Sequence, residues 1–104
     1  MSRTLSSGHS ITLRLLRARR YRIPRYGVVH ARLWQVRTTP ADSKTNRHPL
    51  PLPPRITYTI ELRGLDSHRF ASLGSDETRA LALWTRLVRN TVTPCALRDV
   101  LEEM

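Results

Sequence analysis

The segment RITYTIEL at residues 55–62 constrains the fold most, because its side chains alternate between apolar and polar along its length. Such a period of two predicts a β-strand with one buried face and one solvent-facing face. The strand therefore needs other elements to cover its apolar side. The apolar side carries Ile56, Tyr58, Ile60 and Leu62, and the polar side carries Thr57, Thr59 and Glu61.

Two neighbouring segments predict further strands. Residues 26–36, YGVVHARLWQV, are rich in aromatic and β-branched residues, which favour strands. Residues 64–67, GLDS, have the composition of a turn, and HRFASLG at 68–74 can return as the second arm of a hairpin. We therefore expect an antiparallel meander of about three strands.

The C-terminal third predicts two helices. Apolar residues recur at helical spacing between Ala80 and Val88, and Ser75 or Asp76 can cap a helix over residues 76–90, which Asn90 can end in a left-handed conformation. Thr93 followed by proline repeats the start signal for a second helix over 94–104. That helix carries one Arg against three acids, so DNA phosphates would repel it. Its charge therefore argues against a DNA-binding helix-turn-helix motif.

These elements predict an α+β fold, in which a short antiparallel β-meander of about three strands is packed by two C-terminal helices. The expected domain covers residues 26–104. A proline-rich loop at 38–54 interrupts it, either as a hairpin insertion or as a linker. The expected core contains Tyr58, Ile60, Trp84, Leu87, Leu97 and Leu101.

Charge is distributed unevenly along the chain. Residues 1–55 hold twelve Arg and Lys against one acid, a net +11, whereas residues 56–104 hold six Arg against seven acids, a net −1. This asymmetry predicts a basic N-terminal arm at residues 1–25, with disorder left open. Periodicity does not decide between strand and helix there, because 11–15 alternate as a strand while 15–20 could open a helix.

The segment RLLRARRYRIPRY at residues 14–26 is the sharpest candidate for a binding site. Its arginines can neutralise phosphates, and its tyrosines can offer rings on which unpaired bases stack. RNA is therefore a reasonable partner, although a solvated leader of biased composition explains the same residues. The candidate nucleic-acid-binding residues are Arg14, Arg17, Arg19, Arg20, Tyr21, Arg22, Arg25 and Tyr26.

No catalytic, metal or cofactor site is expected. The four histidines lie about twenty residues apart with no Cys at ligand spacing, and no glycine pattern that cradles phosphate is present. Cys95, at the start of the second predicted helix, is expected to be a packed or capping thiol, and the lesser alternative is a reactive thiol, with which the chain would be an enzyme. We therefore expect a protein that is not an enzyme.

The C-terminal half resembles a small uncharacterised domain family of Gram-positive bacteria that pairs a β-meander with two helices, the second carrying P-x-x-L-x-D-V-x-E. About half of the chain is covered, and YGVV at residues 26–29 extends the match. The family has no assigned activity, so the resemblance implies a fold and no function. The matching residues are Tyr58, Ile60, Ser75, Asp76, Leu87, Asn90, Pro94, Leu97, Asp99, Val100 and Glu102.

Two functions of different classes follow as hypotheses. The first is an interaction module that contacts an unknown protein or a second copy of itself, and the second is a basic RNA-associated protein acting through residues 1–25. No stretch is apolar and long enough for a membrane span, and the single cysteine suits a reducing compartment, so a cytoplasmic location is expected. The Arg-rich, acid-free residues 1–41 keep an organellar presequence as the alternative.

Overall fold

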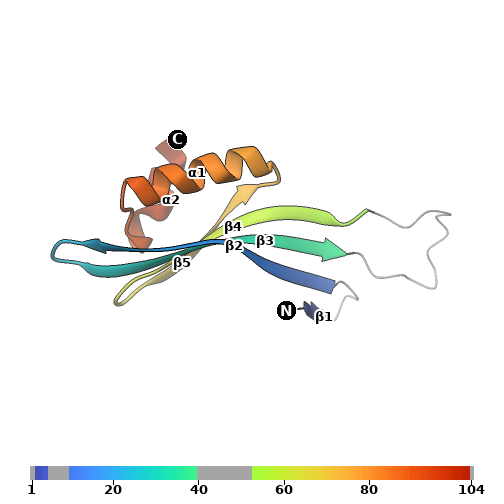
Figure 1. Cartoon of the computed structure of the whole chain (residues 1–104), viewed down its shortest axis with the longest axis horizontal. Coiled ribbons are helices and arrows are strands. Elements are labelled where there is room, and N and C mark those ends of the chain that lie inside the picture. Colours follow the sequence, from blue (N-terminus) through green and yellow to red (C-terminus); the bar gives the residue numbers. More distant parts are fainter. Residues whose placement is uncertain (1, 5–9, 40–52, 104) are drawn as a thin grey trace.

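The computed structural model describes residues 2–4, 10–39 and 53–103 (Figure 1). Residues 38 and 39 end a strand and residues 53 and 54 precede the next one, so most of the predicted proline-rich loop, residues 40–52, lies outside the described residues. The elements, in chain order, are β1 (Ser2–Thr4), β2 (Ser10–Ile23), β3 (Gly27–Thr39), β4 (Arg55–Arg63), β5 (His68–Gly74), α1 (Glu77–Arg89), the 3-10 helix η1 (Pro94–Ala96) and α2 (Leu97–Glu103).

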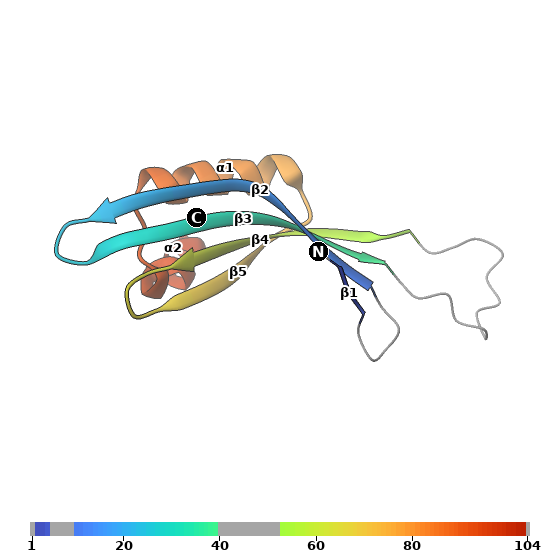
Figure 2. The same cartoon turned by 60° about the horizontal axis from the view of Figure 1, so that its bottom comes forward.

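The strands form one antiparallel sheet in the order β1-β2-β3-β4-β5, so each strand pairs with its neighbour in sequence (Figure 2). The α+β class is confirmed, but the expected number of about three strands was too low, because four long strands and the three-residue β1 make up the sheet. The missed strands are β2 and the short β1, and both lie within the predicted arm. The alternation of β2 is interrupted, which is why periodicity did not reveal it.

Strand β2 corrects the picture of an appended basic arm. Residues 10–23 pair with β3 from Ser10 opposite Thr39 to Ile23 opposite Gly27. The tight turn between the two strands includes Arg25 at φ 67°, a left-handed conformation, and a backbone hydrogen bond from the Tyr26 amide to the Ile23 carbonyl. The predicted boundary between residues 25 and 26 therefore falls inside a hairpin.

A bulge in β2 explains the ambiguous pattern. The register shifts between Leu15 and Arg17, so Leu16 is an extra residue opposite β3. Before the bulge the odd-numbered Leu15 lies opposite Trp34, and after it the odd-numbered Arg19 lies opposite Ala31 on the other face. Leu16 itself packs against the core. A sequence that changes face midway cannot show a single period.

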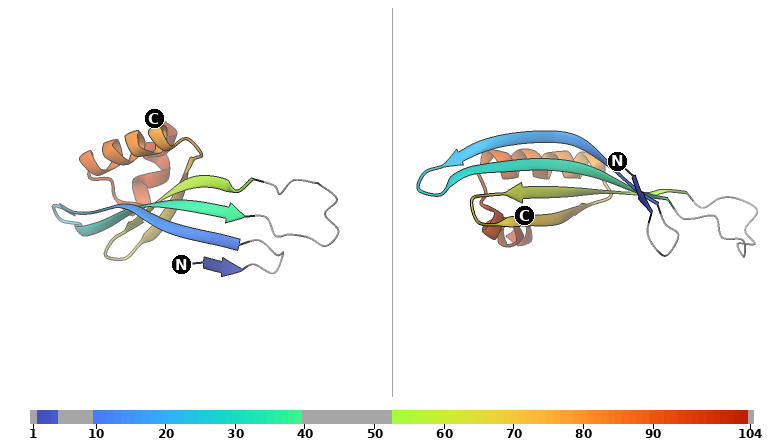
Figure 3. Two further views of the ribbon diagram at one scale, coloured as in Figure 1. Left: turned by 45° about the vertical axis from the view of Figure 1, so that its right-hand side comes forward. Right: turned by 90° about the horizontal axis from the view of Figure 1, so that it is seen from below.

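The helices cover one face of the sheet, and no described element packs on the other face, which we call the open face (Figure 3). The sheet is longer than the helices, because the 14 residues of β2 rise about 3.3 Å each and the 13 residues of α1 only about 1.5 Å each. Of the expected core, all but one residue are buried, and Leu101 is half-buried and packs against the others. The buried hydrophobic side chains are those of Val29, Ala31, Leu33, Tyr58, Ile60, Leu62, Leu73, Ala80, Trp84, Leu87, Val92 and Leu97.

The helix signals were read largely correctly. The Asp76 carboxylate accepts a hydrogen bond from the Arg79 amide at 3.2 Å and so caps α1. Asn90 ends the helix as expected, but its φ of −85° is not left-handed, and Thr91 at φ 46° takes that conformation instead. Thr93 precedes a proline at the start of η1, although its side chain makes no capping hydrogen bond. None of the helices in the described ranges is long and apolar enough to cross a membrane.

Candidate nucleic-acid interface

The structure divides the predicted arginine cluster between the two faces of the sheet. Paired residues of neighbouring strands point to the same face, so Arg19, opposite the buried Ala31, lies on the helix side, and Arg20 and Arg22, opposite His30 and Val28, lie on the open face. Arg17, opposite the buried Leu33, is also on the helix side, as is Arg14, opposite Gln35. Arg25 lies in the turn. The predicted residues do not form one site.

The two predicted stacking tyrosines have structural partners. Tyr21 is half-buried on the helix side and donates a hydrogen bond to the Val92 carbonyl at 2.5 Å. Burial, with a smaller contribution from Tyr26, raises the pKa of Tyr21 to about 12. The Tyr26 hydroxyl lies 3.0 Å from the Ser67 hydroxyl, and its ring packs so closely on Gly64 that a Cβ there would meet ring carbons at 2.9 Å. Both tyrosines therefore join elements of the fold.

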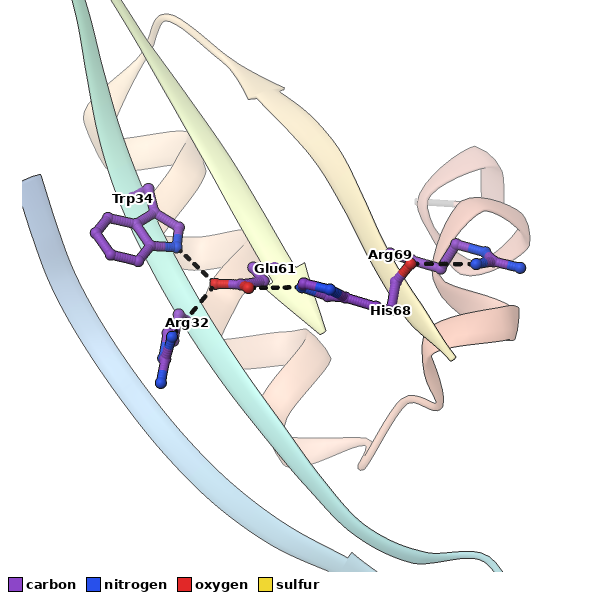
Figure 4. A network of polar contacts seen from close by, with 5 residues as sticks. All are labelled: Arg32, Trp34, Glu61, His68 and Arg69. Atoms are coloured by element: carbon purple, nitrogen blue, oxygen red, sulfur yellow. Dashed lines mark hydrogen bonds and ion pairs between the residues drawn. The ribbon is translucent and has the colours of Figure 1, made fainter. Parts of the chain in front are cut away.

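Glu61, on the open face of β4, is the centre of a polar network that the sequence did not reveal (Figure 4). Its Oε1 accepts a hydrogen bond from Trp34 Nε1 at 2.8 Å, and Arg32 Nη1 lies 3.9 Å from the same oxygen. On the opposite side, His68 Nε2 lies 2.6 Å from Oε2. These neighbours leave Glu61 only 8% exposed although it belongs to the uncovered face.

This network keeps Glu61 ionised. Burial by itself raises the pKa of Glu61, but the hydrogen bonds from Trp34 and His68, together with the charges of His68 and Arg32, outweigh burial and hold the pKa below its ordinary value of 4.5. A carboxylate with such a pKa is an acceptor of hydrogen bonds at neutral pH. It can therefore hold donors on the open face, whether they come from the chain or from a ligand.

An apolar hollow of about 280 Å³ lies on one side of this network. We call it the apolar hollow, and two of its apolar walls, Phe70 and Leu13, are 60% and 39% exposed. The Phe70 ring also lies 4.6 Å from the His68 ring, centroid to centroid, at an interplanar angle of 42°. The apolar hollow is lined by Leu13, Arg32, Trp34, Val36, Thr59, Glu61 and Phe70.

A second hollow of about 560 Å³, the cationic hollow, shares Arg32 and Glu61 with the first. Its other walls come from β3, from β4 and from the turn between β4 and β5. His30 on β3 lies opposite Arg63 on β4, directly before this turn. Leu65 in the turn is 82% exposed. The cationic hollow is lined by Val28, His30, Arg32, Glu61, Arg63, Gly64 and Leu65.

The remaining candidates offer less chemistry. Cys95 is exposed, so it is not a packed thiol, and its capping and reactive alternatives stay predictions. It lines a groove between β5 and α2 together with Arg98 and Asp99. Within residues 2–4, 10–39 and 53–103, no three His, Cys, Asp or Glu side chains lie close enough together to hold a metal ion. The open face therefore has the strongest claim as a site.

Comparisons with protein-family models, curated proteins and solved structures gave no match to this chain. The resemblance to a Gram-positive family therefore stays a prediction, and function has to be argued from the surface itself. Sequence reasoning missed this surface because its residues come from four strands. The only local signal was Glu61, the single acid in a strand whose other polar residues are threonines and arginines.

Proposed function

We propose that this chain is a non-enzymatic interaction module and that it binds single-stranded RNA across the open face of its sheet. The observation that carries this proposal is the adjacency of the apolar hollow and the cationic hollow, which share Arg32 and Glu61. A nucleotide has a planar base joined to an anionic phosphate. The apolar hollow suits the base, and the neighbouring cationic hollow suits the phosphate.

Charge supports an anionic partner. Arg20, Arg22, Arg32 and Arg63 all lie on the open face by register, and the one acid among their strand neighbours there, Glu61, has Arg32 Nη1 3.9 Å from its Oε1. Arginine forks engage phosphate oxygens in pairs. Each phosphate contact releases counterions. For a single strand, each contact therefore lowers the logarithm of the binding constant by about 0.7 for every tenfold increase in salt concentration.

Exposed rings support unpaired bases rather than a duplex. Phe70 is 60% exposed on β5, and Trp34 and His68 lie on the same face. A base stacked on an aromatic side chain contributes about 1–3 kcal/mol, and a single strand presents base faces that a duplex conceals. The open face therefore offers contacts that only an unstacked strand can use.

The test is fluorescence anisotropy of a labelled single-stranded RNA, titrated with the full chain at several salt concentrations. Replacing Arg22 and Arg63 with Gln should weaken binding and lower the salt slope by about 1.4, because two phosphate contacts are lost. Arg79→Gln with Arg86→Gln on α1 is the matched control, since it removes the same charge from the helix side. Equal losses in both pairs would contradict the proposal and would indicate a non-specific charge effect.

A protein partner or a second copy is the other candidate, favoured by the exposed apolar side chains of Leu13, Leu15 and Phe70. Contiguous apolar residues on a surface mark many protein contacts. Sedimentation of the chain over a range of concentrations distinguishes the two candidates. A dimer that a Phe70→Ser substitution dissociates would favour self-association through the open face.

A further inference from the structure

The apolar hollow also indicates which base it accepts, an inference that rests on the proposed function. At about 280 Å³ it lies just below the usual volume range of ligand pockets, about 300–1,000 Å³. A single planar heterocycle suits this size better than a larger ligand does. The apolar walls include Trp34, Val36 and Phe70, and the polar walls are Arg32, Thr59 and Glu61.

The free acceptor capacity of Glu61 determines the chemistry of the ligand edge. An ionised carboxylate has about four acceptor positions. Within the described residues, Trp34 uses one position on Oε1 and His68 uses one on Oε2, while Arg32 at 3.9 Å is too far for a hydrogen bond. Each oxygen therefore keeps a position for a ligand. Trp34 and His68 approach the carboxylate from opposite sides (Figure 4). Each of them occupies a position on a different oxygen, so both oxygens can still accept a hydrogen bond from a ligand.

Among the four bases, guanine alone presents two adjacent donors, N1–H and the 2-amino group, without an acceptor between them. Adenine and cytosine each present one amino group beside a ring nitrogen acceptor, which a carboxylate repels, and the single N–H of uracil lies between two carbonyl acceptors. Proteins that read single-stranded RNA commonly bond such base edges while stacking the ring. The two oxygens of one carboxylate match two parallel donors.

We propose that the apolar hollow is a guanine-binding subsite, in which Glu61 accepts hydrogen bonds from N1–H and the 2-amino group while Phe70 and Trp34 contact the base. Arg32 is common to both hollows and lies beside Oε1, so it is placed to contact the phosphate of the same nucleotide. The neutral-pH ionisation of Glu61 described above supplies the acceptor.

Anisotropy with uridine octamers that carry one central guanosine, inosine, adenosine or cytidine tests this subsite on the unmodified chain. Guanosine should bind about tenfold more tightly than the all-uridine strand, since a good bidentate contact to a base edge discriminates between bases by about this factor or more. Inosine, which lacks the 2-amino group, should lose a large part of this gain. Equal affinity for the guanosine and inosine strands would contradict the proposed hydrogen bond between Glu61 and the 2-amino group.

Glu61→Gln tests the role of the carboxylate. The guanosine preference should disappear, whereas Glu102→Gln, which removes one negative charge from an exposed site on α2, should keep it. Near-ultraviolet circular dichroism checks that the variant folds, and the inosine comparison does not depend on any variant. If all octamers bind equally with a steep salt dependence, the guanine subsite is wrong and RNA binding stands. If no octamer binds at low salt, the proposed function itself fails.

Discussion

At the scale of single residues, Glu61 shows how an ionised carboxylate is stabilised on a basic, partly apolar surface. Its two oxygens accept hydrogen bonds from Trp34 and His68, which come from the strands on either side of β4. A buried charge without such partners costs several kcal/mol. The same groups that make Glu61 tolerable in the fold also fix the direction of its remaining lone pairs, so stability and binding depend on one geometry.

The lowered pKa of Glu61 predicts a dependence of stability on acid. Because the folded-state pKa lies below the ordinary value of 4.5, the unfolded chain binds this proton more readily, so the stabilisation is present above that value and is lost as pH falls through the folded-state pKa. Urea unfolding should show the wild type more stable than Glu61→Gln at about pH 5.5, with the difference narrowing by about pH 3. Glu102→Gln is the control for charge. A difference that widens in acid would contradict the network described for Glu61.

At the scale of elements, β2 shows where sequence reasoning succeeds and where it stops. The strand at residues 55–62, the hairpin at 64–74 and the capped helix were all predicted, because each follows a single period with local end signals. Strand β2 was not predicted, because one extra residue at Leu16 exchanges the faces of the alternation. The open-face site was missed for a related reason. The pairing register of β3, β4 and β5 brings Trp34, Glu61 and His68 together, and the sequence alone does not give this register.

The bulge predicts opposite outcomes for two adjacent leucines. Leu15 lies on the open face and is 47% exposed, whereas Leu16 packs against the core. Leu16→Ala should lower the free energy of unfolding by about 1–2 kcal/mol, less than the roughly 2–5 kcal/mol of a fully buried leucine. Leu15→Ala should change it by no more than about 0.5 kcal/mol. Urea unfolding of both variants checks this, and a larger loss from Leu15→Ala would mean that the bulge lies elsewhere.

At the scale of the whole molecule, the charge asymmetry of the sequence does not correspond to two parts in space. The basic half contributes β2 and β3, and the nearly neutral half contributes β4, β5 and the helices that pack on one face of the sheet. One sheet therefore joins the two halves, and Arg20 and Arg22 of β2 lie on the same open face as Arg32 of β3 and Arg63 of β4. This arrangement concentrates positive charge on a surface without requiring a separate arm.

The unity of the sheet predicts that residues 1–25 cannot be removed without loss of the fold. Their deletion takes away β2, which pairs with β3 along most of its length, and with it the contacts of Leu16, Tyr21 and Ile23 with the core. We expect the truncated chain to lose its cooperative urea transition and the near-ultraviolet circular dichroism of packed Trp84. The matched control is the full-length chain with Arg17→Gln and Arg22→Gln, which removes charge but keeps the strand and should unfold cooperatively. If the truncated chain unfolds with the midpoint of the full chain, residues 10–23 are an appendage after all, and RNA binding could then be assigned to a separate arm.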